Sequence, residues 1–364
     1  MTLNKARVLV DFSATRRPNN GLGQFSVHLA QALSQLNDPT MALEYLAPSN
    51  AADRLPRGAT LRAPSRWCDQ RIPTILRRIK GYDWRYDLWH ISNQNSRFWP
   101  ARASTKTILT IHDLNFLREK NSFRIKKYLH RLQVLIDRAD ALTTISDFVR
   151  IEIEQHLNLN NKPVEVIYNG GAGIQAKPVK PKQITNNKPF LFSIGEYLAK
   201  KNFASLLPML NHLPEFNLVL AGKNATPYGD LVREQINRLG LQDRVLLLGI
   251  VSDAEKQWLY QQTTAFVFPS LTEGFGLPIL EAMAQGSLVV CSNQTSLPEI
   301  GGEHAYYWQD FEPRTMAEQV RAALSERAEN PSQQARAKAH ALTFSWHRCA
   351  KQYNALYGRM LGSS

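Results

Sequence analysis

Residues 265–281 of the chain, AFVFPSLTEGFGLPILE, combine three kinds of local structure in one short stretch. Ala265–Phe268 is a brief apolar run, typical of a buried strand. The turn after it leads into Glu273-Gly-Phe-Gly, where two glycines allow the backbone to approach a ligand closely. Pro278 then favours the start of a helix, because proline has no N–H to leave unpaired there. The stretch therefore predicts a strand, a glycine loop and a helix in succession, as in a parallel α/β sheet.

Two carboxylates bracket this glycine loop. Glu273 stands just before it, and Glu281 falls about one turn into the expected helix. Backbone N–H groups at a helix N-terminus favour phosphate, and carboxylates accept hydrogen bonds from hydroxyl groups. The combination indicates a site for a sugar nucleotide, with one carboxylate for the sugar and the other for the ribose. An ordinary glycine turn with incidental glutamates is the competing interpretation.

The rest of the chain also alternates short apolar segments with segments of helical spacing. We expect a first series of strands at 7–12, 87–91, 106–111, 141–145 and 164–168. A second series follows the proline-containing connector 176–189, at 190–195, 217–222, 244–249, 265–268 and 287–291. The sequence thus predicts an α/β fold with two Rossmann-like, doubly wound parallel sheets that face each other across a cleft. Such sheets bind ligands at the carboxyl ends of their strands, so both sheets can offer these ends to one cleft.

Several segments together carry a family resemblance. Glu273–Glu281 is an E-x7-E element with a G-F-G-L-P interior, and related segments surround it at 221–223, 244–249, 281–284 and 296–302. With these motifs the chain resembles the retaining glycosyltransferases of family 4, which have the GT-B fold. The resemblance implies an N-terminal acceptor-binding domain at 1–175 and a nucleotide-sugar-binding domain at 176–345. It also implies a C-terminal helix within 346–364 that crosses back to the N-terminal domain.

The resemblance assigns a donor site to the second domain. Glu273 resembles the residue that binds donor sugar hydroxyls, and Glu281 the residue that binds ribose. Lys201 matches the basic residue that neutralises the diphosphate leaving group, which gains negative charge in the transition state. Lys200 takes a position often held by Arg. The backbone N–H groups expected on the sugar and diphosphate belong to Gly274, Phe275, Gly276 and Leu277.

One position departs from the family pattern. Many relatives carry a second basic residue directly after the strand glycine, where this chain has Glu196. We therefore expect Lys200, Lys201 and backbone amides to neutralise the diphosphate.

The first domain contains candidates for the catalytic and acceptor sides of the reaction. His112 follows the strand at 106–111, and the resemblance implies that it is catalytic, with Asp113 beside it on the acceptor side. Asn19, Gly21 and Gly23 resemble the family's glycine loop, with Asn19 and Gly21 toward the acceptor and Gly23 toward the donor. A purely structural histidine and an ordinary loop turn are the alternatives.

The expected chemistry involves neither a metal ion nor a cofactor. The sequence contains no D-x-D motif of the kind that holds Mn²⁺ in the other large glycosyltransferase fold. The resemblance implies a metal-independent enzyme for which the nucleotide-diphosphate sugar is a substrate. We identify no carboxylate nucleophile of the kind that retaining glycoside chemistry often uses. The resemblance therefore favours front-face substitution, in which the leaving phosphate helps to deprotonate the acceptor hydroxyl.

Basic residues gather in the first domain. Residues 54–138 hold 19 basic and 6 acidic side chains, and their net charge of +13 equals that of the whole chain. In 66–80 and 123–131 the cations alternate with apolar residues, as in segments that lie on anionic membranes. We expect peripheral contact of Arg54–Arg138 with an anionic membrane or with an anionic acceptor; solvated faces of packed helices are the alternative. No nucleic acid is expected, because no zinc-finger spacing or RNA-recognition motif accompanies the patch.

The cysteines and the apolar segments bear on the location of the protein. There are three cysteines and no C-x-x-C pair, which argues against a disulfide framework or a structural zinc site. We find no signal peptide and no run of about 20 apolar residues that could span a membrane. A cytoplasmic protein at the inner face of the cytoplasmic membrane is the expectation.

These inferences combine into one expected activity. We expect a hexosyltransferase that moves mannose from GDP-mannose to a glycan acceptor, either lipid-linked or a lipopolysaccharide. The choice of mannose depends on the resemblance of 296–302 to mannosyltransferase-like members, and UDP-glucose and UDP-GlcNAc stay open as donors. The alternatives are a GT-B sugar-nucleotide epimerase and a non-catalytic partner that binds sugar nucleotides.

Overall fold

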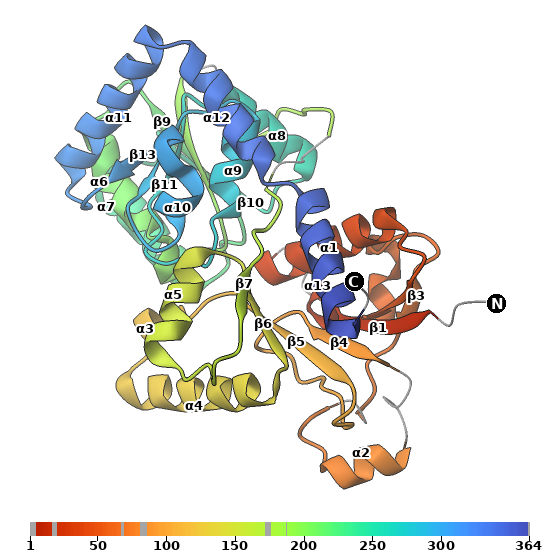
Figure 1. The fold of residues 1–364 in the computed structure, drawn as a ribbon. Coiled ribbons are helices and arrows are strands. Elements are labelled where there is room, and N and C mark those ends of the chain that lie inside the picture. Colours follow the sequence, from red (N-terminus) through yellow and green to blue (C-terminus); the bar gives the residue numbers. More distant parts are fainter. Residues whose placement is uncertain are drawn as a thin grey trace. The chain divides into compact units, whose positions relative to one another are not determined.

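A computed structural model describes residues 5–16, 20–66, 69–80, 86–171, 176–186 and 188–362. The chain forms two compact units, each with its own sheet (Figure 1). The first unit consists of Met1–Gly170 together with Ser345–Ser364, and the second of Gly171–Phe344. None of the helices in the described ranges combines the length and the apolar composition that crossing a membrane requires.

The sheet of the first unit has seven parallel strands in the order β3-β2-β1-β4-β5-β6-β7. They are β1 (Ala6–Asp11), β2 (Met41–Leu46), β3 (Thr60–Arg62), β4 (Leu88–Ile91), β5 (Lys106–Ile111), β6 (Ala141–Thr144) and β7 (Val164–Val166). The order reverses between β1 and β4, which is the doubly wound arrangement. The carboxyl ends of all seven strands lie at one edge, where this fold class binds its ligands.

The sequence-based expectation of five strands for this sheet was incomplete, because it lacked β2 and β3. An acidic residue, Glu44, interrupts the apolar pattern of β2, although its side chain is buried. Arg7 on β1 and Arg62 on β3 each place a guanidinium nitrogen 2.5 Å from this carboxylate, and Tyr86 donates to it at 2.9 Å. Burial raises the pKa of Glu44, but these three hydrogen bonds lower it below its ordinary value. The strand therefore depends on partners that lie far away in the sequence.

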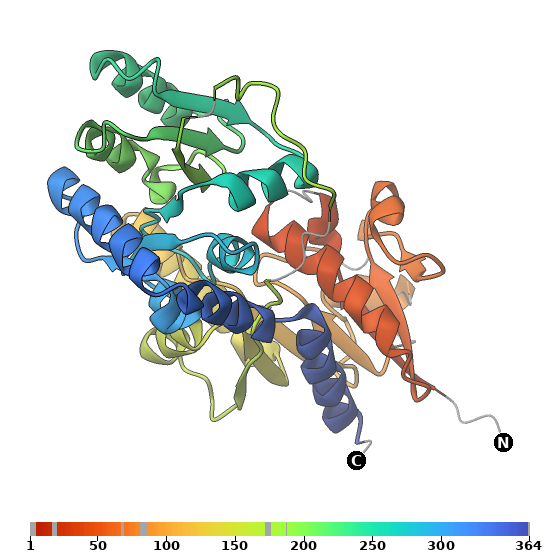
Figure 2. The same cartoon turned by 90° about the horizontal axis from the view of Figure 1, so that it is seen from above.

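Helices cover both faces of this sheet. They are α1 (Gly21–Leu36), α2 (Thr74–Lys80), α3 (Phe116–Glu119), α4 (Ser122–Arg138), α5 (Asp147–His156) and α13 (Trp346–Leu361), with short 3₁₀ turns η1 (Ser13–Arg16) and η2 (Ser49–Arg54). Helix α13 comes from the end of the chain and lies beside α1 (Figures 1 and 2).

A buried polar network joins α13 to the sheet. The ring of His90 on β4 makes 2.7 Å hydrogen bonds with the Tyr357 hydroxyl on α13 and the Thr110 hydroxyl on β5. Thr110 also bonds Thr143 on β6 at 2.7 Å and Tyr353 on α13 at 3.1 Å. All five side chains are buried. Because an unpaired buried polar group is costly, this network specifies the position of α13 within the first unit.

The sheet of the second unit has six parallel strands in the order β10-β9-β8-β11-β12-β13. They are β8 (Phe190–Ile194), β9 (Asn217–Ala221), β10 (Val245–Gly249), β11 (Ala265–Phe268), β12 (Val289–Ser292) and β13 (Tyr306–Trp308). The expected α/β fold with two Rossmann-like parallel sheets is thus confirmed, although the three-residue edge strand β13 was missed.

The helices of the second unit are α6 (Leu206–Asn211), α7 (Pro227–Arg238), α8 (Asp253–Gln262), α9 (Leu277–Ala284), α10 (Leu297–Gly301), α11 (Pro313–Glu329) and α12 (Ser332–Thr343), with 3₁₀ turns η4 (Ala199–Lys201), η5 (Phe203–Ser205) and η6 (Gly302–His304). The 3₁₀ turn η5 leads directly into α6. The α-helix begins only at Leu206, which puts Pro208 in its first turn, where the missing N–H breaks no hydrogen bond.

Candidate functional site

The loop that carries Lys201 is held to the end of a neighbouring strand. It leaves β8 at Gly195, whose N–H donates to Ala221 O of β9 at 3.0 Å. Further on, Tyr197 N–H donates to Lys223 O at 3.0 Å, and the Thr226 hydroxyl donates to Tyr197 O at 2.6 Å. These bonds place η4, and with it Lys201, at the carboxyl edge of the sheet.

Lys201 and Glu273 meet at this edge. Lys201 Nζ lies 2.5 Å from Glu273 Oε1, and each side chain is only 14% exposed. The Ser270 hydroxyl donates to the same oxygen at 2.7 Å. Within the described residues, Glu273 Oε2 accepts no hydrogen bond, so one carboxylate oxygen is still available to a ligand hydroxyl. The structure therefore brings together two residues that are 72 positions apart in the chain.

Side chains from the segment after β12 shape the glycine loop. Thr295 Oγ1 accepts from Glu273 N–H at 3.0 Å. The Ser296 hydroxyl donates to the carbonyl oxygens of Glu273 (3.1 Å) and Phe275 (2.9 Å). The Phe275 ring is buried and packs edge-on against Phe344, with ring centroids 6.0 Å apart. The side chain of Phe275 thus anchors the loop, and only its backbone is suited to a ligand.

Gly276 directly precedes α9 and needs to be glycine. Its φ is +108°, and a Cβ there would lie 2.6 Å from a methyl carbon of Leu297. No side chain caps the N-terminus of α9, which begins at Leu277 and contains Pro278 in its first turn. The predicted helix start is therefore present, with backbone N–H groups directed as phosphate binding requires.

Glu281 occupies a second ionic cluster, one turn into α9. Its Oε1 lies 3.0 Å from Lys256 Nζ, and its Oε2 accepts from the Tyr260 hydroxyl at 2.9 Å. Burial lowers the pKa of Lys256, but the charge and hydrogen bond of Glu281, together with Asp253, raise it above its usual value. Burial also raises the pKa of Tyr260, which keeps the hydroxyl a donor. Lys256 and Tyr260 thus hold the Glu281 carboxylate in place on α9.

The backbone carbonyl of Lys200 connects its own 3₁₀ turn to the segment before Glu273. Its carbonyl oxygen accepts from Leu271 N–H at 2.7 Å and from the Ser270 hydroxyl at 3.1 Å, which ties η4 to the turn before Glu273. At the position where this chain departs from the family pattern, Glu196 lies 3.4 Å from Lys223 Nζ, and this exposed ion pair offsets the extra negative charge.

In the first unit, His112 lies at the carboxyl end of β5. Its side chain is 5% exposed and packs edge-on against Phe25, with ring centroids 4.7 Å apart. Its Nε2 lies 2.8 Å from Ser92 O, so this nitrogen carries the proton and Nδ1 is left as the acceptor. Burial lowers the pKa of His112 to about 4, so the imidazole is neutral at physiological pH.

The predicted glycine loop differs in the structure. Helix α1 begins at Gly21 rather than after the loop, so Gly21 and Gly23 lie in its first turn. The reason is a cap: Asn20 Oδ1 accepts from Gly23 N–H at 2.8 Å, which pairs one N–H of that turn. Asp113 Oδ1 accepts from Asn115 N–H at 3.1 Å in the turn after β5. Asn19 lies outside the described residues.

Comparison with known families identifies this chain. A model described as "Glycosyltransferase Family 4" matches residues 19–170, and one described as "Glycosyl transferases group 1" matches residues 175–340. The chain belongs to the family 4 glycosyltransferases. The predicted family and enzyme class are therefore confirmed.

Relatives of this glycosyltransferase match 80–92% of its length. The O-antigen chain mannosyltransferase B of Escherichia coli is 27% identical, over 92% of this chain and 95% of its own. The O-antigen chain mannosyltransferase RfbU of Salmonella typhimurium is 24% identical, over 82% and 86%. The GDP-mannose:cellobiosyl-diphosphopolyprenol alpha-mannosyltransferase of Komagataeibacter xylinus is 29% identical, over 80% and 75%.

Solved structures share the fold of this glycosyltransferase. Sucrose-phosphate synthase of Thermosynechococcus elongatus superposes with a TM-score of 0.77 at 17% identity, over 99% of this chain and 100% of its own. HepE of Anabaena, in complex with UDP-glucose, superposes with a TM-score of 0.72 at 17% identity, over 97% and 99%.

Sequence reasoning missed two residues of the glycosyltransferase's second ionic cluster, Lys256 and Tyr260. Both lie on α8, four positions apart, and so share one face of that helix. The spacing was a usable signal, but nothing local indicated that this face meets Glu281. Among the described residues, no three His, Cys, Asp or Glu side chains gather as a metal site would require.

The buried histidines predict a pH dependence of stability. Burial lowers the pKa of His90 to about 3 and that of His112 to about 4, whereas an unfolded histidine titrates near pH 6.5. Below pH 6.5 the unfolded chain therefore binds protons that the folded chain does not, and the free energy of unfolding falls. We expect the free energy of unfolding to fall by up to about 1.4 kcal/mol per pH unit for each histidine. Denaturant unfolding between pH 6 and 5 measures this loss. His112→Gln should reduce this slope by about half, and a flat profile in the unmodified protein would contradict the argument.

Proposed function

We propose that this glycosyltransferase moves a mannosyl residue from GDP-mannose to a lipid-linked glycan of surface-polysaccharide assembly, with retention of anomeric configuration. The relatives' names support the sugar and the acceptor class, since all three are mannosyltransferases. One of them is named for GDP-mannose and for an acceptor on diphosphopolyprenol. Sequence similarity over at least three quarters of each relative supports the same overall reaction here.

The observation that carries the proposal is the Lys201–Glu273 pair beside the N-terminus of α9. The pair offers an ammonium for the departing diphosphate and a carboxylate oxygen for a sugar hydroxyl. Helix-terminal N–H groups add fixed partial positive charge where the diphosphate gains negative charge. Glu281, held by Lys256 and Tyr260, is suited to the ribose hydroxyls of the nucleotide.

In the proposed reaction the acceptor hydroxyl attacks the anomeric carbon from the face that the diphosphate leaves. The departing phosphate oxygen takes the proton of that hydroxyl, so no carboxylate nucleophile is needed. His112, neutral and with Nδ1 as acceptor, would orient a hydroxyl through a hydrogen bond. Lys200 and Lys201 would neutralise the diphosphate, so we also propose that the reaction needs neither a divalent cation nor another cofactor.

A donor screen tests the proposal. Purified protein is heated with GDP-mannose, UDP-glucose, UDP-GlcNAc or ADP-glucose, since a ligand that binds the folded state raises the unfolding midpoint. The best donor is then incubated with lipid-linked oligosaccharide, with and without EDTA. We expect a shift with GDP-mannose and mannosyl transfer that persists in EDTA. A shift only with a UDP-sugar would overturn the choice of donor, and activity lost in EDTA and restored by Mg²⁺ would overturn metal independence.

We propose further that α4 lies on an anionic membrane surface, at the inner face of the cytoplasmic membrane. The first half of this helix is exposed, including Phe123 at 76% and Tyr128 at 37%. Arg124, Lys126 and Lys127 are exposed between these rings. The buried residues of α4, by contrast, come from its second half. Exposed aromatic rings among cations are suited to the headgroup region of anionic lipid. The other segment expected to bind, 66–80, includes Trp67 and Cys68, which lie outside the described residues.

Liposome flotation tests this contact. We expect the protein to float with vesicles that contain phosphatidylglycerol, and to float poorly with neutral vesicles. The double substitution Lys126→Gln with Lys127→Gln should weaken binding about thirtyfold, because each surface cation is worth about 1 kcal/mol on anionic lipid. Ile250→Ser, which removes a 66% exposed apolar side chain of the second unit, is the matched control and should leave flotation unchanged. Equal flotation of all three proteins would count against α4.

A further inference from the structure

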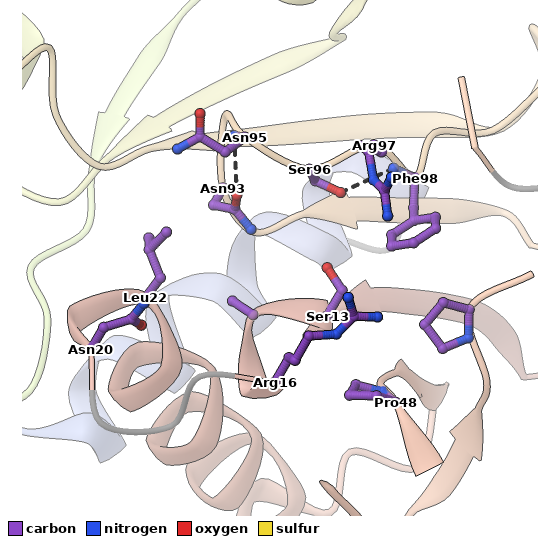
Figure 3. Close-up of a pocket in the computed structure, with 12 residues that line it drawn as sticks. Ser13, Arg16, Asn20, Leu22, Pro48, Asn93, Asn95, Ser96, Arg97 and Phe98 are labelled. Carbon is purple, nitrogen blue, oxygen red and sulfur yellow. Dashed lines mark hydrogen bonds between the residues drawn. The ribbon is translucent and has the colours of Figure 1, made fainter. Parts of the chain in front are cut away.

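A pocket of 390 Å³ opens in the first unit, and nothing in the sequence analysis indicated it. Its walls come from the segments that follow four adjacent strands: Pro64 after β3, Pro48 after β2, Ser13 after β1 and Asn93 after β4 (Figure 3). The pocket therefore lies along the carboxyl edge of the sheet, where proteins of this fold class hold their ligands. Its volume suits a small ligand or one end of a larger one.

Two arginines face this pocket from opposite walls. Arg16 ends η1 on one side, and Arg97 follows β4 on the other (Figure 3). Arg97 Nη1 lies 3.8 Å from Asp69, but that carboxylate is already bound by Arg71, with contacts of 2.6–3.0 Å to both of its oxygens. Within the described residues, Arg16 makes no ion pair. Both guanidinium groups are therefore available to an anion.

Two asparagines of the pocket present their side-chain amides as donors. Asn20 Oδ1 is engaged by Gly23 N–H at 2.8 Å, and Asn93 Oδ1 by Asn95 N–H at 3.0 Å. With each carbonyl oxygen facing its own backbone, the amide NH₂ groups are left to donate toward a ligand. No Asp or Glu belongs to the described lining of the pocket. The Asp11 carboxylate at the end of β1 already accepts from Ser13 N–H at 2.8 Å and from the Ser96 hydroxyl. Two cations and the amide donors therefore favour phosphate over a neutral sugar.

The same pocket borders the predicted catalytic histidine. Ser92 O accepts the hydrogen bond from His112 Nε2 at 2.8 Å, and the next residue, Asn93, lines the pocket. In addition, His112 N–H donates to the Gln94 side chain at 3.0 Å. A group bound in this pocket is thus connected to His112 through a single short loop.

From these observations we infer that the pocket binds the phosphate or diphosphate group of the acceptor, through Arg16 and Arg97. The inference rests on the proposed function, because it takes the acceptor to be a phosphate-bearing glycan or glycolipid. It adds the residues that recognise the acceptor and the chemical group that they recognise. The shared chemistry is a phosphate ester, which a lipid diphosphate or a phosphorylated sugar could both supply.

Calorimetric titration of the full chain tests the inference. Geranyl diphosphate and mannose 6-phosphate are the probes, each added in saturating GDP so that the donor site is filled. Each is titrated into the unmodified protein, Arg16→Gln, Arg97→Gln and the control Arg57→Gln, which removes an exposed arginine outside the pocket. GDP binding is measured in parallel on all four proteins.

We expect geranyl diphosphate to bind the unmodified protein. Each pocket variant should lower the affinity for it at least about tenfold, the loss typical of a removed charged hydrogen bond. Arg57→Gln should change it less than about twofold, and GDP binding should be unchanged. Tighter binding of geranyl diphosphate supports a lipid diphosphate, and tighter binding of mannose 6-phosphate supports a phosphorylated glycan.

Three results would overturn the inference. Weaker GDP binding in Arg16→Gln or Arg97→Gln would assign the pocket to the donor diphosphate. Probe binding that neither substitution weakens would place the phosphate site elsewhere. No binding of either probe, with GDP binding and mannosyl transfer intact, would refute the inference alone. A protein that binds no nucleotide and transfers no mannose would instead refute the proposed function.

Discussion

Replacing Lys201 by alanine is expected to lower kcat for transfer by about 10²- to 10³-fold, the largest effect on activity that the structure predicts. The Lys201 side chain is only 14% exposed, so water does not screen its charge fully from a departing diphosphate. Preorganised charge directed at a leaving group is worth about this factor when it is removed. The measurement is steady-state transfer from saturating donor, so that a change in donor affinity does not obscure the change in kcat.

Two controls make this prediction specific. Lys338→Ala removes an exposed lysine of the same unit and should leave kcat within about twofold of the unmodified value. Glu273→Gln removes the partner of Lys201 and keeps the side-chain shape, and it should raise KM for the sugar nucleotide as well as lower kcat. Circular dichroism and the unfolding midpoint establish that each variant is folded. A folded Lys201→Ala enzyme with normal kcat would remove Lys201 from the proposed mechanism.

Replacing Gly222 by alanine is expected to destabilise the second unit by more than about 3 kcal/mol. Gly222 has a φ of +122°, a conformation that strains any residue with a Cβ, and that Cβ would overlap the carbonyl oxygen of Gly195. The obstacle is backbone, so no rotation of a side chain relieves it. Movement of Gly195 would disturb the loop that carries Lys201, so donor binding should fail together with stability. Denaturant unfolding and the GDP-induced shift of the unfolding midpoint report the two effects.

Gly240 provides the matched control for this substitution. Its φ is also positive, at +66°, but a Cβ there would meet nothing within 4 Å. Gly240→Ala should therefore cost only about 1 kcal/mol, the strain of the left-handed conformation without a clash. Similar losses at the two positions would mean that the close approach of Gly222 to Gly195 matters less than the backbone conformation.

Local sequence patterns predicted most of the strands and the loop and helix of the candidate donor site. Apolar runs between turn residues predicted β1, β5, β8 and β11 closely, because burial on both faces of a parallel strand leaves a continuous hydrophobic pattern. The segment 273–281 predicted its own loop and helix, since the residues that shape the turn lie within it. The catalytic and binding roles of Glu273, Glu281, Lys201 and His112 stay predictions until the variants are measured.

The failures have three different causes. Strand β2 has Glu44 in its interior, which is acceptable only because arginines on two neighbouring strands neutralise it. Edge strands β3 and β13 are three residues long, too short for a periodic signal. Gly21 and Gly23, which were assigned to a glycine loop, lie in the first turn of α1, because the Asn20 cap lets the helix begin among the glycines.

The sequence by itself determined the fold class and the family, and it predicted which residues face the donor, because each of these depends on short patterns with their own physical cause. Only the tertiary structure decided which residues touch. It brings Lys201 within 2.5 Å of Glu273, and it places Lys256 and Tyr260 in contact with Glu281. It alone also assembled, from the ends of four strands, the pocket that we propose for the acceptor phosphate. Hydrogen bonds and ion pairs require separations of about 3 Å, and only the packing of the whole sheet brings distant segments that close.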